Sequence, residues 1–217
     1  MNSKRVVIVL QILLAAATSL FASDAKIQAV AESSPVAVDN AYFRALKNSI
    51  GSAESNTNVG TRVIVALTNC VVQSSRGSSE LQRGQIAVFR VDETFKPPTG
   101  EYFEVAFKLN HPPLKAPEKW IEPLKNTIVY QDDQFRVFEE RLEAGGVREL
   151  HSHAQRLVVR LNTVQLTDPR FHETARPGSG IQVANTAKYA EPVVHAVRNT
   201  SEIPLFNIVI EYKLPHD

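Results

Sequence analysis

The sequence predicts an all-β protein of two small barrels or sandwiches in tandem, preceded by an N-terminal signal. Short runs rich in Val, Ile and Thr alternate with turn-forming residues, and twelve Pro and nine Gly are spread along 217 residues. No segment after the N-terminal region has sustained helical periodicity. A chain of this length with 43% apolar residues can bury a sizeable core, but it is too short for more than two compact domains.

The charge balance excludes one class of function. The 24 basic and 23 acidic residues give a formal charge of +1. Nucleic-acid-binding proteins usually present a basic face, so we expect no nucleic-acid partner. No run of like charges suggests a polybasic membrane patch.

The first 25 residues have the pattern of a signal peptide. Lys4 and Arg5 precede an apolar stretch over residues 6–22, and the small residues Ser23 and Ala25 follow it. An uncleaved anchor is the alternative, but 17 residues lie at the short limit for spanning a bilayer. We therefore expect an exported protein, periplasmic or secreted, with no stable membrane anchor after cleavage.

The strands of the mature chain fall into two similar copies. Residues 61–74 (TRVIVALTNCVVQS) resemble residues 155–168 (QRLVVRLNTVQLTD) at a separation of 94, and each reads as strand, turn, strand. A polar, Gly-bearing loop follows each, as in SRGSSELQRG at residues 75–84. The closing strands, 101–107 and 204–212, are 103 apart, which makes the second copy nine residues longer. We expect the two copies to pack together, since neither is large enough to be stable alone.

These copies define the expected domains. They are an extension at 26–40, a first barrel at 41–110, a Pro-rich linker at 111–126 and a second barrel at 127–217. One stretch, Asn40–Lys47, is the exception to the strand pattern and is predicted to form a turn or two of helix capped by Asp39. The single cysteine, Cys70, cannot form an internal disulfide and is expected to be a buried strand residue.

Three histidines form a candidate metal site. His151 and His153 are two residues apart, so on a strand they point to the same face, about 7 Å from each other. A third imidazole, from His195 on a neighbouring strand, would complete a facial set with positions left open. Gly145 and Gly146 permit the turn that leads into the strand. Imidazole ligands fit a divalent transition metal (Fe, Mn, Ni, Cu or Zn) and do not select among them.

This arrangement resembles the cupins, small β-barrels (double-stranded β-helix or jelly roll) with two metal-site motifs. The first motif places a Gly six residues before an H-x-H pair, as Gly145 stands before His151. The second ends in His-x-x-x-Asn, matched by His195 and Asn199. We expect Asn199 to fix a strand turn rather than to bind a ligand. The whole chain thus resembles a bicupin.

The match to these motifs is incomplete. Where the cupins have a Glu after the pair, this chain has Leu157 or Val158, and the nearest polar candidate ligand is Gln155. The first copy aligns Thr57, Val59 and Thr61 with His151, His153 and Gln155, so it resembles a barrel without a metal site.

Three further residues are candidates for substrate binding. An inward arginine can hold a carboxylate by two hydrogen bonds, which nominates Arg148 and Arg156, and Tyr130 could line a pocket. The alternative is a charged outer strand face for the arginines and aromatic core for Tyr130.

The resemblance implies several functions. The first is a metal-dependent enzyme (dioxygenase, decarboxylase or isomerase type) acting on a small polar organic acid, in a protein that forms a homodimer. Two other functions stay open: a barrel that binds a sugar or other small ligand without turnover, and a purely structural barrel whose histidines are satisfied in the core.

Overall fold

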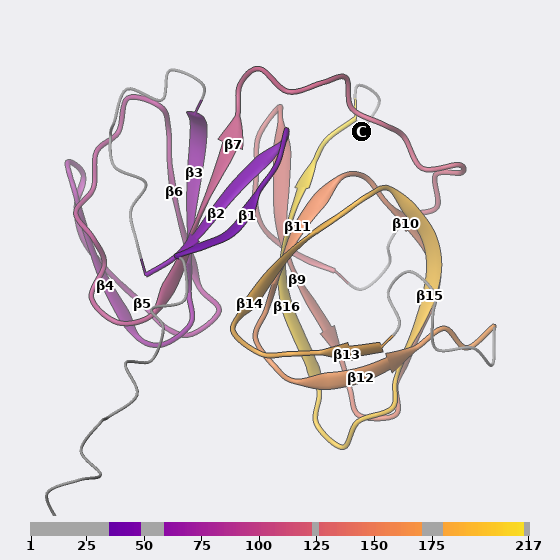
Figure 1. The fold of residues 1–217 in the computed structure, drawn as a ribbon. Helices are drawn as coiled ribbons and strands as arrows, with labels where there is room; N and C mark the ends of the chain where they lie inside the picture. Colours follow the sequence, from indigo (N-terminus) through magenta and orange to yellow (C-terminus); the bar gives the residue numbers. More distant parts are fainter. Residues whose placement is uncertain (1–34, 49–58, 123–125, 171–179, 215–217) are drawn as a thin grey trace, which may run out of the picture. The chain divides into compact units, whose positions relative to one another are not determined.

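The computed structural model describes residues 35–48, 59–122, 126–170 and 180–214 (Figure 1). All of them belong to one compact unit, residues 35–217. Within these ranges every regular element is a strand, and no helix is long and apolar enough to cross a membrane. The predicted signal peptide and Thr57 lie outside the described residues.

The first half is built on a five-stranded antiparallel sheet in the order β1-β2-β7-β3-β6. A two-stranded hairpin, β4-β5, accompanies this sheet. The strands are β1 (Val36–Asp39), β2 (Phe43–Lys47), β3 (Val59–Ala66), β4 (Cys70–Ser74), β5 (Gly77–Leu81), β6 (Ile86–Phe89) and β7 (Tyr102–Lys108). The first of these, β1, begins inside the segment that the sequence assigns to an N-terminal extension.

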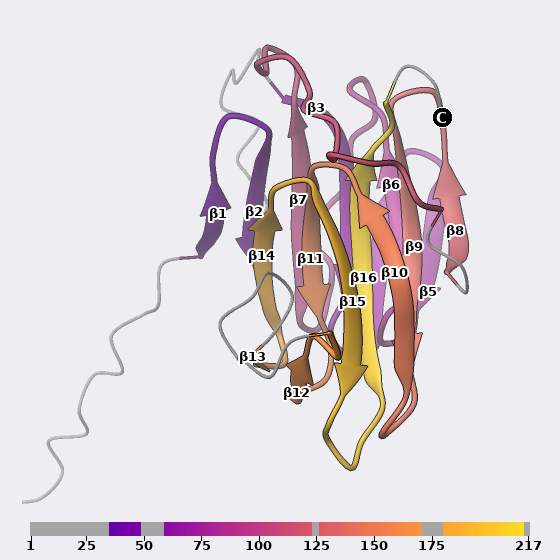
Figure 2. The ribbon, with the colours of Figure 1, turned by 90° about the vertical axis from the view of Figure 1, so that its right-hand side faces the viewer.

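The second half has two antiparallel sheets, in the orders β14-β11-β16-β9-β8 and β10-β15-β12-β13. Figure 2 shows the first of them with β14 at one edge and β8 at the other. The strands are β8 (Thr127–Gln131), β9 (Phe135–Leu142), β10 (Val147–His153), β11 (Arg156–Arg160), β12 (Val164–Thr167), β13 (Gly180–Gln182), β14 (Thr186–Ala190), β15 (Val193–Asn199) and β16 (Leu205–Tyr212).

The two halves share one strand order, which confirms the predicted repeat. The second sheet, read from its β8 edge, has the order β8-β9-β16-β11-β14. Its strands correspond one by one to those of the first sheet, β1-β2-β7-β3-β6, and each set occurs in the same sequence along the chain. Val63 on β3 pairs with Val105, and Leu157 on β11, 94 residues later, pairs with Ile210. The separation at the closing strand is therefore 105, from Val105 to Ile210, so the second copy is eleven residues longer rather than nine.

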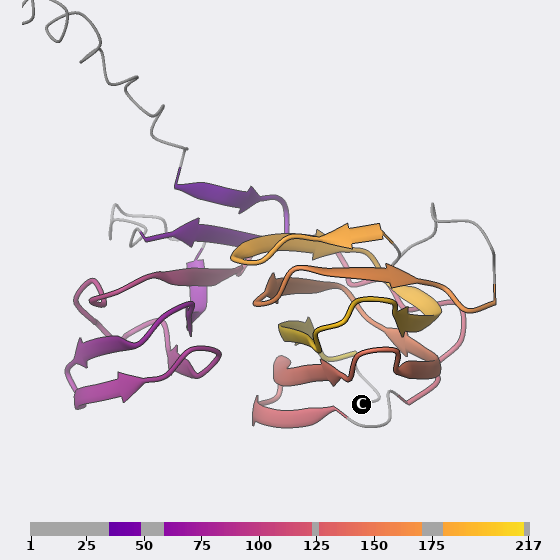
Figure 3. The ribbon, with the colours of Figure 1, turned by 90° about the horizontal axis from the view of Figure 1, so that it is seen from below.

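The largest core lies between the two five-stranded sheets. Alternate residues of each sheet point into it, because side chains on a strand alternate between its faces. Its fully buried members include Val63 and Val105 from the first half and Phe135, Leu157 and Ile210 from the second. The hydroxyl of Tyr212 donates to the carbonyl of Tyr42 at 3.0 Å across the halves. The expectation that the two copies pack together is confirmed; Figure 3 shows them as two groups of strands.

Two local expectations are wrong. The Asn40–Lys47 segment is a strand, not a helix: Asn40 Oδ1 accepts from the amides of Tyr42 and Phe43, and β2 then pairs with β7. The burial of Phe43 and Ala45 shows the two-residue period of a strand. Within the predicted loop at 75–84, Gly77–Leu81 forms β5, whose backbone pairs with β4 although its first four residues are exposed. Cys70 is buried on β4, as expected.

Candidate metal centre

A tight turn and a bulged strand present the first two histidines. Gly145 has a φ of +71°, a left-handed conformation that favours glycine, and the amide of Gly146 donates to the carbonyl of Glu143 at 2.9 Å. The strand that follows, β10, shifts register between Arg148 and His151. His151 and His153 are both 2% exposed, and their ring centroids lie 4.9 Å apart.

The third histidine comes from the neighbouring strand, as the sequence predicts. β15 pairs with β10, and His195 is the direct partner of His151. The ring centroid of His195 lies 4.5 Å from that of His151 and 5.5 Å from that of His153. One ring nitrogen from each histidine lies within 4.8 Å of the other two, and all three residues are buried. Three imidazoles thus converge in the second barrel.

Asn199 fixes the turns around this site. Its Nδ2 donates to the carbonyls of Leu142, Glu143 and Ile203, at 3.2, 3.3 and 2.8 Å. Its Oδ1 accepts from the amide of Ser201 at 3.0 Å. The side chain therefore joins the turn before β10 to the turn after β15, which confirms the structural role expected of it.

His151 has a defined tautomer. Its Nδ1 lies 2.7 Å from the carbonyl oxygen of Glu149, and a carbonyl can only accept, so Nδ1 carries the proton. Nε2 then keeps its lone pair, and in the described part of the chain this buried atom has no hydrogen-bond partner. Burial lowers the pKa of His151, which favours the neutral form that binds metals.

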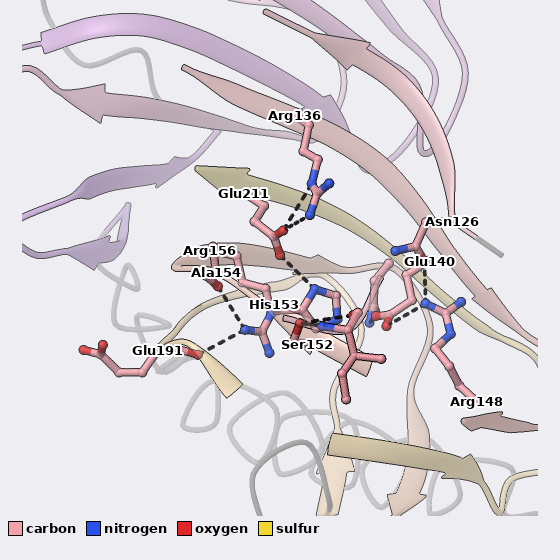
Figure 4. A network of polar contacts seen from close by, with 12 residues as sticks. Asn126, Arg136, Glu140, Arg148, Ser152, His153, Ala154, Arg156, Glu191 and Glu211 are labelled. Carbon is pink, nitrogen blue, oxygen red and sulfur yellow. Dashed lines mark hydrogen bonds and ion pairs between the residues drawn. The ribbon is translucent and has the colours of Figure 1, made fainter. Parts of the chain in front are cut away.

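A buried carboxylate orients His153 in the same way. Glu211 on β16 places Oε2 2.8 Å from Nδ1 of His153, and Arg136 donates to its Oε1 at 2.6 Å (Figure 4). Burial, together with the nearby Arg156 guanidinium, holds the pKa of His153 well below its usual value. Burial also raises the pKa of Glu211, an effect that Arg136 opposes. A carboxylate hydrogen-bonded to the far nitrogen is the usual support of a metal-binding histidine.

The pocket next to the histidines carries more positive than negative side chains. The cations that line it are Arg156, Arg160 and Lys188, and Glu140 supplies the one carboxylate among the described lining residues. The full set of described lining residues is Glu140, His153, Arg156, Val158, Arg160, Leu166, Gln182, Lys188, Ala190, His195, Val197, Leu205 and Asn207.

Glu140 was not among the residues singled out from the sequence. It lies on β9 and is 9% exposed. Asn207 donates to its Oε2 at 2.9 Å, and Arg148 donates to its Oε1 at 3.3 Å. The pattern FEERLE around it shows three acidic residues without distinguishing them. Only the pairing of β9 with β16, where Glu140 is the partner of Asn207, turns this one toward the pocket.

Of the two arginines predicted to bind a substrate, one lines this pocket and the other is held by several polar partners. Arg156 lines the pocket and donates to the carbonyls of Ala154 and Glu191 (Figure 4). Arg148 is 4% exposed and is held by Glu140, the carbonyl of Arg141 and the side chain of Asn126.

Gln155 and Tyr130 are occupied elsewhere. Gln155 accepts from the amide of Lys115 at 2.7 Å and donates to the hydroxyl of Tyr189 at 3.1 Å, so both ends of its amide are engaged away from the histidines. Tyr130 packs against the core between the sheets, and its hydroxyl donates to Asp132. The structure therefore brings together His151, His153 and His195 with Arg156, and not with Gln155 or Tyr130.

Hydrogen bonds connect the linker to β10, the strand that carries His151 and His153. The amide of Ile121 donates to Ser152 Oγ at 2.7 Å, and the amide of Ser152 donates back to the carbonyl of Ile121 at 2.9 Å. Ser152 stands between the two histidines of β10 and is fully buried. Two hydrogen bonds thus fix Ile121 of the linker to the strand that carries His151 and His153.

The residues present fit a divalent transition metal. The Nε2 of His151 is buried, has no hydrogen-bond partner in the described residues and is free to bind a metal. The Nδ1 of His153 is hydrogen-bonded to Glu211, which leaves its Nε2 for the metal. Two defined tautomers and a third imidazole on the facing strand make a donor set of nitrogen ligands, which suits Fe, Mn, Ni, Cu or Zn.

No family model matches the chain, and no curated protein matches it. Among solved structures, AerE from Microcystis aeruginosa is similar at 10% identity and a TM-score of 0.49, over 79% of this chain and 86% of that one. A cupin 2 conserved barrel domain protein from Leptotrichia buccalis is similar at 9% identity and a TM-score of 0.48, over 81% and 86%. An oxalate decarboxylase is similar at 12% identity and a TM-score of 0.49, over 78% and 68%.

TM-scores below 0.5 at 9–12% identity carry no argument about this chain. The description of its fold therefore rests on the strand order and pairing given above. The chain resembles the cupins: it is an all-β protein of two jelly-roll barrels in tandem, and the second holds a cluster of three histidines.

Proposed function

We propose that the second barrel binds one divalent transition metal through His151, His153 and His195, and takes a small anionic organic molecule beside it. The observation that carries this proposal is the convergence of three buried imidazole ligands within 4.8 Å of one another. Three protein nitrogens leave coordination positions open, which is typical of metal sites that bind a substrate or ligand. A metal there would act as a Lewis acid on an oxygen of that molecule.

The charge of the pocket supports an anionic ligand. Arg156, Arg160 and Lys188 outnumber Glu140 among the described lining residues. The Nε of Arg160 is buried without a hydrogen-bond partner in the described residues, and burial lowers the pKa of this guanidinium. A carboxylate would satisfy such a donor by a charge-assisted hydrogen bond.

Metal content tests the proposal directly. The mature protein, purified without a histidine tag, is expected to hold near-stoichiometric metal by elemental mass spectrometry. The double variant His151→Ala/His153→Ala is expected to lose it while keeping its β-sheet circular dichroism. His111→Gln is the matched control, since His111 packs beside Tyr42 and Tyr212, away from the cluster. Absence of metal from the parent, even after incubation with Fe(II), Mn(II), Ni(II) and Zn(II), would contradict the proposal.

Turnover separates an enzyme from a binding protein. Oxygen uptake and decarboxylation are to be measured with small organic acids on the metal-loaded protein. Conversion that disappears in the double histidine variant supports a metal-dependent enzyme of dioxygenase or decarboxylase type. Binding of the same acids without conversion supports a non-catalytic ligand-binding barrel.

We also propose that the chain is exported and forms a homodimer. Export is supported by the signal-like residues 1–25, and cell fractionation with N-terminal sequencing of the mature protein tests it. The dimer is supported by the edge strand β8, whose Ile128 and Val129 are 51% and 43% exposed. A monomeric mass in sedimentation equilibrium would contradict the dimer.

A further inference from the structure

We propose that Glu140 supplies the negative charge that the three-histidine site lacks, and is thereby a determinant of divalent-metal affinity. This inference rests on the proposed metal site. Neutral imidazoles contribute no charge, so a divalent cation bound by them would keep its full charge in a buried pocket. Burying an uncompensated charge is strongly unfavourable. The arginines Arg156 and Arg160 increase the positive charge of the pocket further.

Glu140 is positioned to meet this need. Its carboxylate lines the same pocket as His153 and His195 and is almost entirely buried. Figure 4 shows Glu140 with Arg148 on one side of His153 and Arg156 on the other. Burial opposes ionisation of Glu140, but the adjacent Arg148 guanidinium and the hydrogen bond from Asn207 lower its pKa. The carboxylate is therefore charged at neutral pH.

The second buried carboxylate is less available. Glu211 receives two hydrogen bonds from Arg136, at 3.2 and 2.6 Å on the same oxygen, and its other oxygen is bonded to His153. Among the described residues Glu140 accepts from one guanidinium nitrogen, that of Arg148 at 3.3 Å, and Arg148 divides its donors among three partners. More of the charge of Glu140 is thus uncompensated within the pocket.

Neutralising the carboxylate at constant shape tests the role of its charge. Glu140→Gln keeps an oxygen that can accept from Asn207 and removes the charge. We expect its affinities for Zn(II) and Mn(II), measured by calorimetry on chelator-treated protein, to fall about 10- to 100-fold, the usual effect of losing an outer partner of a metal site. Glu139→Gln is the control: it makes the same change one residue away, where Glu139 pairs with Arg141 at 2.8 Å. It should leave both affinities unchanged.

A charge swap separates charge from structure. In Glu140→Gln/Asn207→Asp the carboxylate and the amide exchange places across their 2.9 Å hydrogen bond, and the carboxylate introduced on β16 returns a negative charge to the same pocket. We expect the metal affinities of this double variant to lie close to those of the parent. If Glu140→Gln alone folds poorly, the double variant can still be compared with the parent.

The outcomes distinguish the two proposals. Parent affinity retained in a folded Glu140→Gln, or a folded charge swap that regains nothing, would overturn the role of Glu140 and leave the histidine site standing. Failure of the parent to bind any of Fe(II), Mn(II), Ni(II) and Zn(II) would overturn the histidine site itself.

Discussion

The two barrels of this protein are alike on their shared faces and different inside. In the first barrel, β2, β7 and β3 align Arg44, Ala106 and Arg62 as direct cross-strand partners. In the second, the equivalent positions on β9, β16 and β11 hold Arg136, Glu211 and Arg156. The two flanking arginines are the same in both copies, and the residue between them changes from Ala to Glu.

This difference decides which barrel can support a polar site. Apolar residues such as Ile64, Phe89 and Tyr102 form a core between the first five-stranded sheet and the β4-β5 hairpin. The second interior has its apolar cluster around Val164 and Leu205, and elsewhere holds histidines, arginines and carboxylates. Buried charges are tolerated there because Glu211 compensates the arginines and orients His153. The fold is thus common to both copies, while the site depends on inward side chains.

The shared face is where a substitution should have the largest effect. Phe135 is fully buried between the sheets, with its ring centroid 4.2 Å from that of Phe107 in the other half. Phe135→Ala should lower the free energy of unfolding by about 3–5 kcal/mol by opening a cavity. Denaturant unfolding is to be followed by the fluorescence of Trp120, the single tryptophan, and by circular dichroism.

Both probes should shift together, since the cavity lies in a core that belongs to both halves. Ile181→Ala on β13, where the residue is 69% exposed, is the control and should change stability by less than about 0.5 kcal/mol. Two separate transitions, with only one of them shifted, would show that the halves unfold independently.

Making the second interior resemble the first should have the next largest effect. Glu211→Ala puts the residue of the first copy between Arg136 and Arg156 and leaves two buried arginines without their carboxylate. Removing one partner of a buried ion pair costs about 3 kcal/mol or more. Thermal and denaturant unfolding measure this loss, and metal affinity should fall as well because His153 loses its hydrogen-bond acceptor.

The control is a substitution at Ala106, the residue of the first copy that is equivalent to Glu211. Ala106→Ser enlarges the equivalent residue of the first copy slightly and adds no charge, so it should leave metal affinity unchanged. A stable Glu211→Ala protein with the metal affinity of the parent would show that the carboxylate neither compensates the arginines nor orients the histidine.

The sequence predicted the elements that have a periodic apolar pattern and missed those held by partners far along the chain. The β-branched runs identified β3, β4, β7, β11, β12 and β16. The strand β5 was not predicted because four of its five residues are exposed, so it has no apolar pattern, and it is held by backbone pairing with β4. The helical turn assigned to Asn40–Lys47 was wrong because pairing with β7 overrides a weak local preference.

The same distinction applies to the site. His151, His153 and His195 were found because two are adjacent on one strand and the third ends a recognisable motif. The partners Glu140 and Glu211 were missed because strand register, across 67 and 58 residues, brings them to Asn207 and His153. Local spacing suggested Gln155 as a ligand, but its amide is engaged by Lys115 and Tyr189, contacts that no local pattern reveals.

The smallest expected effect concerns a turn that the copies share. Ser74 Oγ accepts from the amide of Arg76 at 3.2 Å, and 94 residues later Asp168 Oδ1 accepts from the amide of Arg170 at 3.0 Å. The second copy adds an ion pair, in which Arg170 donates to Asp168 at 2.7 Å. Asp168→Ser should therefore keep the turn and lose the ion pair, which is worth about 1 kcal/mol or less because the arginine is partly exposed.

The pH dependence of this difference identifies its cause. Hydrogen bonds from Arg170 lower the pKa of Asp168, so the folded state binds its proton less readily than the unfolded state. The stability that Asp168 contributes is then fully present above its unfolded pKa, about 3.9, and is lost as the pH falls through the folded value. Unfolding free energies of parent and Asp168→Ser should differ at pH 7 and converge toward pH 3. A difference independent of pH would mean that the aspartate acts through the shape of the turn, as Ser74 does, and that its charge contributes nothing.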